Sequence, residues 1–133
     1  MEDCIFCNIV EGKSPSYKVY EDEKYYGLLD IYPASKGHVL LITKKHYRWV
    51  HDVEDFEKYW GTALKVKKAI DKAFSPKWVQ YLTHGIIAHA HIHIIPRYDE
   101  INDFWKNVIP KQGKLKFSKV EMDDIAKKIS TAF

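Results

Sequence analysis

Residues 89–97 read His-Ala-His-Ile-His-Ile-Ile-Pro-Arg, so three histidines occupy every second position and apolar residues fill the places between them. Alternate side chains of a β-strand share one face. A strand here would place the three imidazoles on one surface, roughly 6.5–7 Å apart, and would pack Ala90, Ile92 and Ile94 into the layer behind. The pattern therefore predicts a strand whose histidine face could serve one small anion or one metal ion.

Three kinds of role are open to this face of histidines. It could be a solvated or purely structural surface, a site of nucleophilic or acid–base chemistry, or a metal site. A leftover expression tag does not explain it, because a tag would be terminal and would not alternate with isoleucine. We therefore favour chemistry or metal binding.

The composition of the 133 residues predicts one domain with its own hydrophobic core. Hydrophobic residues make up 46% and charged residues 29%, and the formal net charge is +3. That charge is too small to indicate nucleic-acid binding, although it suits a small anionic ligand. No apolar run is long enough for a membrane span, and Glu2 and Asp3 stand where a signal peptide would be basic. We therefore expect a cytoplasmic protein without a membrane partner.

Both cysteines lie in the segment Cys4-Ile5-Phe6-Cys7. In a reducing compartment such a pair is a redox dithiol, half of a zinc site or a buried pair of thiols. A redox dithiol of the thioredoxin type opens a helix after a strand, and no strand is expected before this one. Zinc is therefore favoured, and it needs two further ligands. Because the chain has no other cysteine and seven histidines, both ligands are expected to be histidine.

Turn formers and helix-capping residues divide the chain into strands and helices. Asp52 is a suitable cap for one long helix, and Ser118 with Glu121 forms a capping-box pattern that opens a C-terminal helix. His84-Gly85 is interpreted as a two-residue hairpin turn between the last two strands. The expected elements are a short helical or irregular arm at 4–10, strands at 18–21, 25–29, 38–43, 78–83 and 86–95, and a long helix at 53–74. Short connections between successive strands predict an α+β domain with an antiparallel sheet.

The chain resembles the histidine triad (HIT) family of nucleotide hydrolases and transferases, and its opening segment is similar to zinc-carrying prokaryotic members. The motifs that carry the resemblance span residues 4–97. They are Cys4-Ile-Phe-Cys7-x-Ile9, Asp30-Ile31-x-Pro33-x-x-x-Gly37-His38-x-Leu40, Lys44-Lys45-His46 and the stretch 89–97. The resemblance implies a HIT-like fold over 1–133, with 98–133 as an extension packed on the domain or at a dimer interface, and it implies a homodimer.

The resemblance also implies roles for individual residues. His91 would be the nucleophile that forms a covalent nucleotidyl intermediate, and His93 and His38 would flank the phosphate. Asp30 would accept the ribose hydroxyls. The apolar walls of the base pocket would be Phe6, Ile9, Leu28, Ile31 and Leu40.

In zinc-bearing relatives the first histidine of the triad joins the cysteine pair as a metal ligand. The ligands here would be Cys4, Cys7, His46 and His89. Such a Cys₂His₂ set leaves no open position, so the zinc would be structural.

The chain departs from the family pattern just before the triad. Gly85 stands where family members often have Gln or Asn, and Ile86 stands where some have a hydroxyl residue. An amide that contacts the phosphate is therefore missing or supplied from elsewhere, and Gln80 on the preceding strand is the candidate.

The favoured function is a nucleotide hydrolase or nucleotidyl transferase that acts at the α-phosphate of a nucleoside monophosphate derivative. Phosphoramidates, adenylates and dinucleoside polyphosphates are the substrate classes considered. One alternative is a catalytically weak purine-nucleotide-binding module, which the residues Gly85-Ile86 support. The other is a metalloenzyme with the three histidines as catalytic ligands, although alternate positions of one flat strand are poorly arranged to close around one ion.

Overall fold

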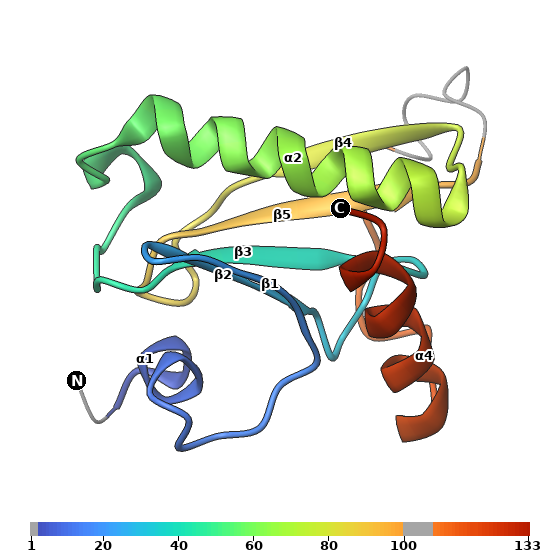
Figure 1. Ribbon diagram of the computed structural model, residues 1–133, viewed down its shortest axis with the longest axis horizontal. Helices are drawn as coiled ribbons and strands as arrows, with labels where there is room; N and C mark the ends of the chain where they lie inside the picture. The colour runs from blue at the N-terminus through green and yellow to red at the C-terminus, as the bar shows by residue number, and fades with distance from the viewer. Residues whose placement is uncertain (1–2, 100–107) are drawn as a thin grey trace.

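The protein folds around a single antiparallel sheet of five strands in the order β1-β2-β3-β5-β4 (Figure 1). A computed structural model describes residues 3–99 and 108–133. Its strands are β1 (Lys18–Glu21), β2 (Tyr25–Leu29), β3 (Val39–Thr43), β4 (Trp78–Leu82) and β5 (His91–Arg97). Every neighbouring pair is antiparallel. The predicted α+β class with an antiparallel sheet is therefore confirmed.

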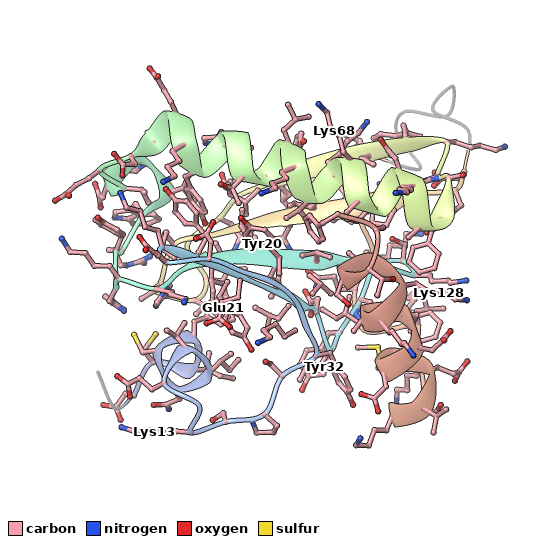
Figure 2. The ribbon with its side chains drawn as sticks, in the orientation of Figure 1. Lys13, Tyr20, Glu21, Tyr32, Lys68 and Lys128 are labelled. Atoms are coloured by element: carbon pink, nitrogen blue, oxygen red, sulfur yellow. The ribbon has the colours of Figure 1, made fainter. Side chains whose placement is uncertain are left out.

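The helices cover the two faces of the sheet unequally. They are α1 (Ile5–Val10), α2 (Phe56–Phe74) and α4 (Lys119–Ser130), with a 3-10 turn η1 at Val50–Asp52. The long helix α2 lies along one face and the short helix α1 lies below the other (Figure 1). Lys68 of α2 and Lys128 of α4 are exposed, and their side chains point away from the sheet (Figure 2). Within the described residues, no helix has both the length and the apolar content of a membrane span.

The alternation of side chains along the strands explains this division. Leu41 of β3 and Ile92 and Ile94 of β5 are fully buried in the main core, together with residues of α2 and α4. Ala90 joins the same core, so the apolar layer predicted behind the histidines is confirmed. A second, smaller core forms on the α1 face from Phe6, Ile9, Leu28, Leu40 and Ile42. The histidine face of β5 therefore looks toward α1.

The long helix begins later than the predicted residue 53. The chain makes the turn η1 and then runs extended through Val53, whose side chain is buried in the main core. The helix starts only at Phe56, and Asp55 rather than Asp52 is its N-cap. It ends as expected, with Ser75 in a left-handed conformation ahead of Pro76.

The predicted two-residue hairpin between the last two strands is wrong. Strand β5 begins at His91, and residues 83–90 form an irregular loop. The Ala90 N–H donates to the carbonyl oxygen of Tyr47 (2.7 Å) rather than to β4, so the chain is drawn toward the segment after β3. Gly85 packs against the Trp49 ring, where an added Cβ would come within 2.1 Å. These distant partners fix the loop, and local turn propensity could not reveal them.

Candidate active site and metal centre

A cavity of about 450 Å³ opens between the histidine face of the sheet and α1. Its apolar walls include all five residues that the resemblance placed around a base, namely Phe6, Ile9, Leu28, Ile31 and Leu40. Asp30, His91 and His93 also line it. The sheet register explains why these groups meet, since Leu40 pairs with both Leu28 and His93 and therefore shares their face.

His91 presents one ring nitrogen to this cavity in a defined state. Its Nδ1 lies 2.7 Å from the carbonyl oxygen of His89, an atom that can only accept a hydrogen bond, so Nδ1 carries the proton. The lone pair of the neutral ring is then on Nε2. Burial lowers the pKa of His91, which keeps the ring neutral at pH 7. A neutral imidazole with a free Nε2 is a competent nucleophile.

His38 and His93 form a buried hydrogen-bonded row beside His91. The N–H of Ala34 donates to His38 Nδ1 (3.0 Å), so the proton of a neutral His38 is on Nε2. That nitrogen lies 2.9 Å from His93 Nδ1. Burial lowers the pKa of each ring to about 3. His38 itself is not in the cavity lining, but its Nε2 lies beside two residues that are, His93 and Asp30.

His84, interpreted from the sequence as a turn residue, extends this row to the cavity. Its Nε2 lies 3.0 Å from His93 Nε2, and its ring packs edge-on against His91 with a centroid distance of 5.0 Å. Sequence reasoning missed this residue because it assumed a tight hairpin, in which His84 would stand at an exposed tip.

Asp30 is a buried carboxylate that lines the same cavity. Its Oδ1 accepts the N–H of Tyr32 (2.8 Å), and its Oδ2 lies 3.5 Å from His38 Nε2. Oδ2 also accepts a hydrogen bond from Gln112 Nε2 (2.8 Å), which lies far along the chain and lines the cavity too. No sequence signal pointed to Gln112, because the segment around it has neither periodicity nor a motif.

Gln80 is the one predicted nucleotide-binding residue that the structure places outside this lining. Its side-chain oxygen accepts from Arg97 (2.6 Å), and its amide donates to the carbonyl oxygen of Val108 (2.8 Å). Arg97 and the chain after β5 thus hold its amide away from His91, and the expectation that Gln80 replaces a phosphate-contacting amide is wrong.

Four residues from three separate segments meet in a cluster suited to a metal. One atom from each of Cys4, Cys7, His46 and His89 lies within 4.8 Å of all the others. His89 Nδ1 is 3.2 Å from Cys4 Sγ and 3.4 Å from Cys7 Sγ, and His46 Nδ1 is 3.3 Å from Cys7 Sγ. The donor set of two sulfurs and two imidazole nitrogens is that of a closed tetrahedral zinc site.

The surroundings of the cluster hold its donors in the state that a metal needs. His89 Nε2 donates to the carbonyl oxygen of Thr43 (2.6 Å), which leaves the lone pair on Nδ1, the nitrogen that faces the sulfurs. Burial lowers the pKa of His89 to about 4, so the ring is neutral. Burial and Cys4 raise the pKa of the Cys7 thiol to about 11, so metal binding would have to displace its proton.

Both ring nitrogens of His89 therefore face other partners than His91 and His93, since Nε2 binds the carbonyl oxygen of Thr43 and Nδ1 faces the sulfurs. The three histidines of the stretch 89–97 do not converge on one ion, which removes the basis for a metalloenzyme with this triad as its catalytic ligands.

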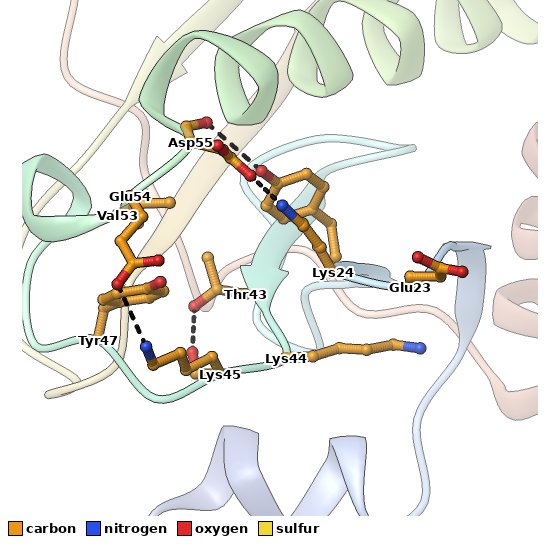
Figure 3. A pocket seen from close by; sticks show the side chains of 10 residues that line it. Glu23, Lys24, Thr43, Lys44, Lys45, Tyr47, Val53, Glu54 and Asp55 are labelled. Carbon is orange, nitrogen blue, oxygen red and sulfur yellow. Dashed lines mark hydrogen bonds and ion pairs between the residues drawn. The ribbon is translucent and has the colours of Figure 1, made fainter.

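A second hollow, lined by residues on either side of Thr43, offers no comparable chemistry (Figure 3). Lys24 pairs with Asp55, Lys45 pairs with Glu54, and the Thr43 hydroxyl donates to the carbonyl oxygen of Lys45. Its lysine–carboxylate pairs neutralise one another, and its lining holds neither histidine nor cysteine. The histidine-lined cavity is the better candidate for a functional site.

This sheet, its histidine row and the Cys₂His₂ cluster define a HIT-domain protein, and residues 11–100 match the family model described as "HIT domain". "Protein hit" of Bacillus subtilis is 39% identical over 116 residues, which cover 79% of this chain and 80% of that protein. "Adenosine 5'-monophosphoramidase HNT1" of Candida albicans is 35% identical over 111 residues, or 73% of this chain and 72% of that protein. A zinc-bound histidine triad family protein from Mycobacterium smegmatis superposes with a TM-score of 0.76 at 25% identity, over 98% of this chain and 93% of that one. The chain belongs to the HIT family.

Proposed function

We propose that this protein hydrolyses or transfers nucleoside monophosphate groups by attack of His91 on an α-phosphorus. The observation that carries the proposal is the 2.7 Å hydrogen bond from His91 Nδ1 to the carbonyl oxygen of His89, which leaves Nε2 free in the cavity. The similarity to a yeast phosphoramidase favours phosphoramidates within the three substrate classes, with adenylates and dinucleoside polyphosphates as the others.

The reaction takes two displacements. In the first, His91 Nε2 forms a bond to phosphorus, and the bond to the leaving group breaks with its electron pair. In the second, water attacks phosphorus, loses a proton, and the electron pair of the phosphorus–nitrogen bond returns to Nε2. The covalent intermediate thus divides one difficult hydrolysis into two easier steps.

The neighbouring residues bind and orient the nucleotide. His93 donates through Nε2 to a phosphate oxygen, and His38 holds it in that tautomer from the other side. The Asp30 carboxylate accepts hydrogen bonds from the ribose hydroxyls. In the free site it accepts them instead from Gln112 and from the backbone N–H of Tyr32. The apolar walls from α1 and the sheet enclose the base.

We also propose that Cys4, Cys7, His46 and His89 hold a structural zinc ion. With all four positions filled by protein, the metal supplies no catalytic water and instead ties α1 to the sheet. This matters for the site because Phe6 and Ile9, two walls of the cavity, lie on α1.

The chain is further proposed to work as a cytoplasmic homodimer. Phe56, Trp60 and Tyr81 form a contiguous strip of aromatic rings that joins α2 to the edge strand β4, and Phe56 and Tyr81 are exposed. Two cysteines held as thiols or zinc ligands suit a reducing compartment. Light scattering should give twice the chain mass of 15.7 kDa, and a Tyr81→Glu variant should give that mass itself.

The proposal is tested by incubating the zinc-loaded protein with adenosine 5'-phosphoramidate, an aminoacyl adenylate and a diadenosine polyphosphate. Wild-type protein should release AMP from at least one, and acid-free mass spectrometry should detect a nucleotidyl adduct on His91. His91→Ala should abolish both, whereas His51→Ala, at an exposed histidine outside the cavity, should not change them. Tight AMP binding without turnover of any substrate would instead favour the nucleotide-binding module.

A further inference from the structure

The loop between β4 and β5 carries a histidine that lies outside the triad yet lines the cavity. His84 contacts both His91 and His93, with ring centroids 5.0 and 4.8 Å away. Its backbone is held firmly, since Arg48 donates to the carbonyl oxygen of Gly85 (3.1 Å) and the Trp49 ring leaves no room for a Cβ at Gly85. The position of this imidazole is therefore built into the fold.

His38, His93 and His84 form a row of three hydrogen-bonded rings, and the contacts of this row accommodate fewer protons than three neutral rings carry. The N–H of Ala34 donates to His38 Nδ1, and the N–H of Ile86 lies 3.3 Å from His84 Nδ1, so each end of the row calls for a lone pair. The two nitrogen–nitrogen contacts inside the row take one proton each. Three neutral imidazoles carry three protons, whereas these contacts accommodate two.

The surplus proton settles at the His84 end. The Ile86 contact is the longest of the four and is exposed, whereas Ala34 holds the buried ring of His38 at 3.0 Å. A proton on His84 Nδ1 costs only this weak contact, and it fixes the direction of donation from His38 to His93 to His84. His84 is thus the ring through which the row exchanges protons with solvent.

His84 also lies on the side of His93 away from the sugar anchor. Asp30 Oδ2 approaches His93 at its Nδ1 edge (3.9 Å), whereas His84 meets the Nε2 edge. A nucleotide whose ribose is held by Asp30 places its phosphate against His93 Nε2, and that phosphate takes over the N–H that His84 accepts in the free site. The Nε2 of His84 is then released beside the phosphate.

We propose that His84 is the acid that protonates the leaving group, an inference that rests on the proposed attack by His91. A proton from solvent occupies the released Nε2, and the resulting imidazolium donates it to the departing amine nitrogen as His91 bonds to phosphorus and the phosphorus–nitrogen bond breaks. The amine leaves neutral. In the second displacement His84 Nε2 takes the proton of the attacking water, which restores the starting state.

The test compares two substrates that share the adenosine 5'-phosphoryl group. An alkylamine phosphoramidate needs its leaving nitrogen protonated, whereas a p-nitrophenyl ester releases a stable phenolate without a proton. The first displacement is isolated in single-turnover experiments with enzyme in excess. In His84→Ala and His84→Gln, the single-turnover rate of amine release from the phosphoramidate should fall roughly 10²- to 10⁴-fold, while that of p-nitrophenolate release from the ester should fall less than about tenfold. KM for both substrates should change little, and His51→Ala should match wild type.

Equal losses in the single-turnover rates of amine release and p-nitrophenolate release would overturn the proposal, because they would make His84 a phosphate contact or a structural group. Undiminished turnover of the phosphoramidate would overturn it as well. Failure of the underlying function has a different signature, in which wild type turns over neither substrate or His91→Ala matches wild type. Added imidazole should partly restore the phosphoramidate reaction of His84→Ala, which a loss of loop structure would not allow.

Discussion

The tautomers of three histidines at the site are set by a main-chain group bound to one of their ring nitrogens. A backbone carbonyl holds the proton of His91, another holds that of His89, and a backbone N–H fixes the lone pair of His38. The types of residue at the site could be predicted from the sequence, because histidine and cysteine side chains are recognisable there as reactive or metal-binding groups. The tautomers could not, because their partners are main-chain groups that every residue possesses.

Asp30 provides a test of the sugar-binding end of the cavity. Asp30→Asn removes the charge that strengthens hydrogen bonds from two ribose hydroxyls, so calorimetry should show AMP binding roughly 10- to 100-fold weaker, as expected for about 1.5–3 kcal/mol. Asp52→Asn is the matched control, since Asp52 lies outside the cavity and should leave the affinity unchanged. Equal affinities for Asp30→Asn and wild type would show that the ribose does not contact this carboxylate.

The buried histidines should make stability depend on pH. The pKa of His38 and of His93 is about 3 in the folded protein, against an ordinary value of 6.5. Between these values the unfolded chain binds more protons than the folded chain, so the free energy of unfolding falls as the pH falls from 6.5 toward 3. Each ring can contribute up to about 1.4 kcal/mol per pH unit in that window.

Urea titrations at pH 7, 6 and 5 would measure this slope. His38→Gln should make it shallower, and His51→Gln, at an exposed position, should not. Comparing variants in the same buffers cancels any contribution from the metal cluster. An unchanged slope in His38→Gln would mean that folding does not lower the pKa of His38.

At the scale of elements, predictions succeeded where the signal was local. The capping box of Ser118 and Glu121 opens α4 at the predicted residue, and strands β1 and β2 have the predicted bounds. They failed at the start of α2 and in the loop 83–90, because the conformation there is set by packing of Val53 and Gly85 against residues far away in the sequence. Of the segment 98–117, residues 108–117 are irregular as expected, and 100–107 lie outside the described part of the chain.

Substitutions at Gly85 and Gly61 distinguish a glycine that packing requires from one that only lowers helix propensity. Gly85→Ala would press its Cβ into the Trp49 ring, so unfolding should be easier by about 1–3 kcal/mol and turnover should fall as His84 moves. Gly61→Ala, in open space on α2, should instead stabilise the fold by roughly 0.5–1 kcal/mol without changing turnover. Thermal unfolding and kcat of both variants check the pair, and an unperturbed Gly85→Ala would contradict the anchored loop.

The whole molecule divides its work between the two faces of one sheet. The α2 and α4 face holds most of the apolar core, and the α1 face holds the cavity and the cluster of cysteines and histidines. Helix α1 has only six residues and packs through the smaller core, so we expect it to depend on the cluster of cysteines and histidines to stay in place. Damage to the cluster should therefore affect the cavity more than the fold.

Removal of the metal tests this dependence. Treatment with a strong chelator, or the variant Cys4→Ser, should weaken AMP binding at least tenfold while far-UV circular dichroism keeps its sheet signal, because Phe6 and Ile9 leave the cavity with α1. Metal analysis of the purified protein should find about one zinc per chain, lost in Cys4→Ser. Unchanged AMP affinity in a zinc-free protein would show that α1 holds its place without the ion.

One residue belongs to both centres. The ring of His89 faces the sulfurs, and the peptide oxygen of the same residue fixes the proton of His91. Loss of the proposed zinc ion would therefore free the His89 ring and weaken the hydrogen bond that fixes the tautomer of His91, the proposed nucleophile. The two proposed functions, metal binding and nucleotidyl transfer, would thus be coupled directly through one amino acid.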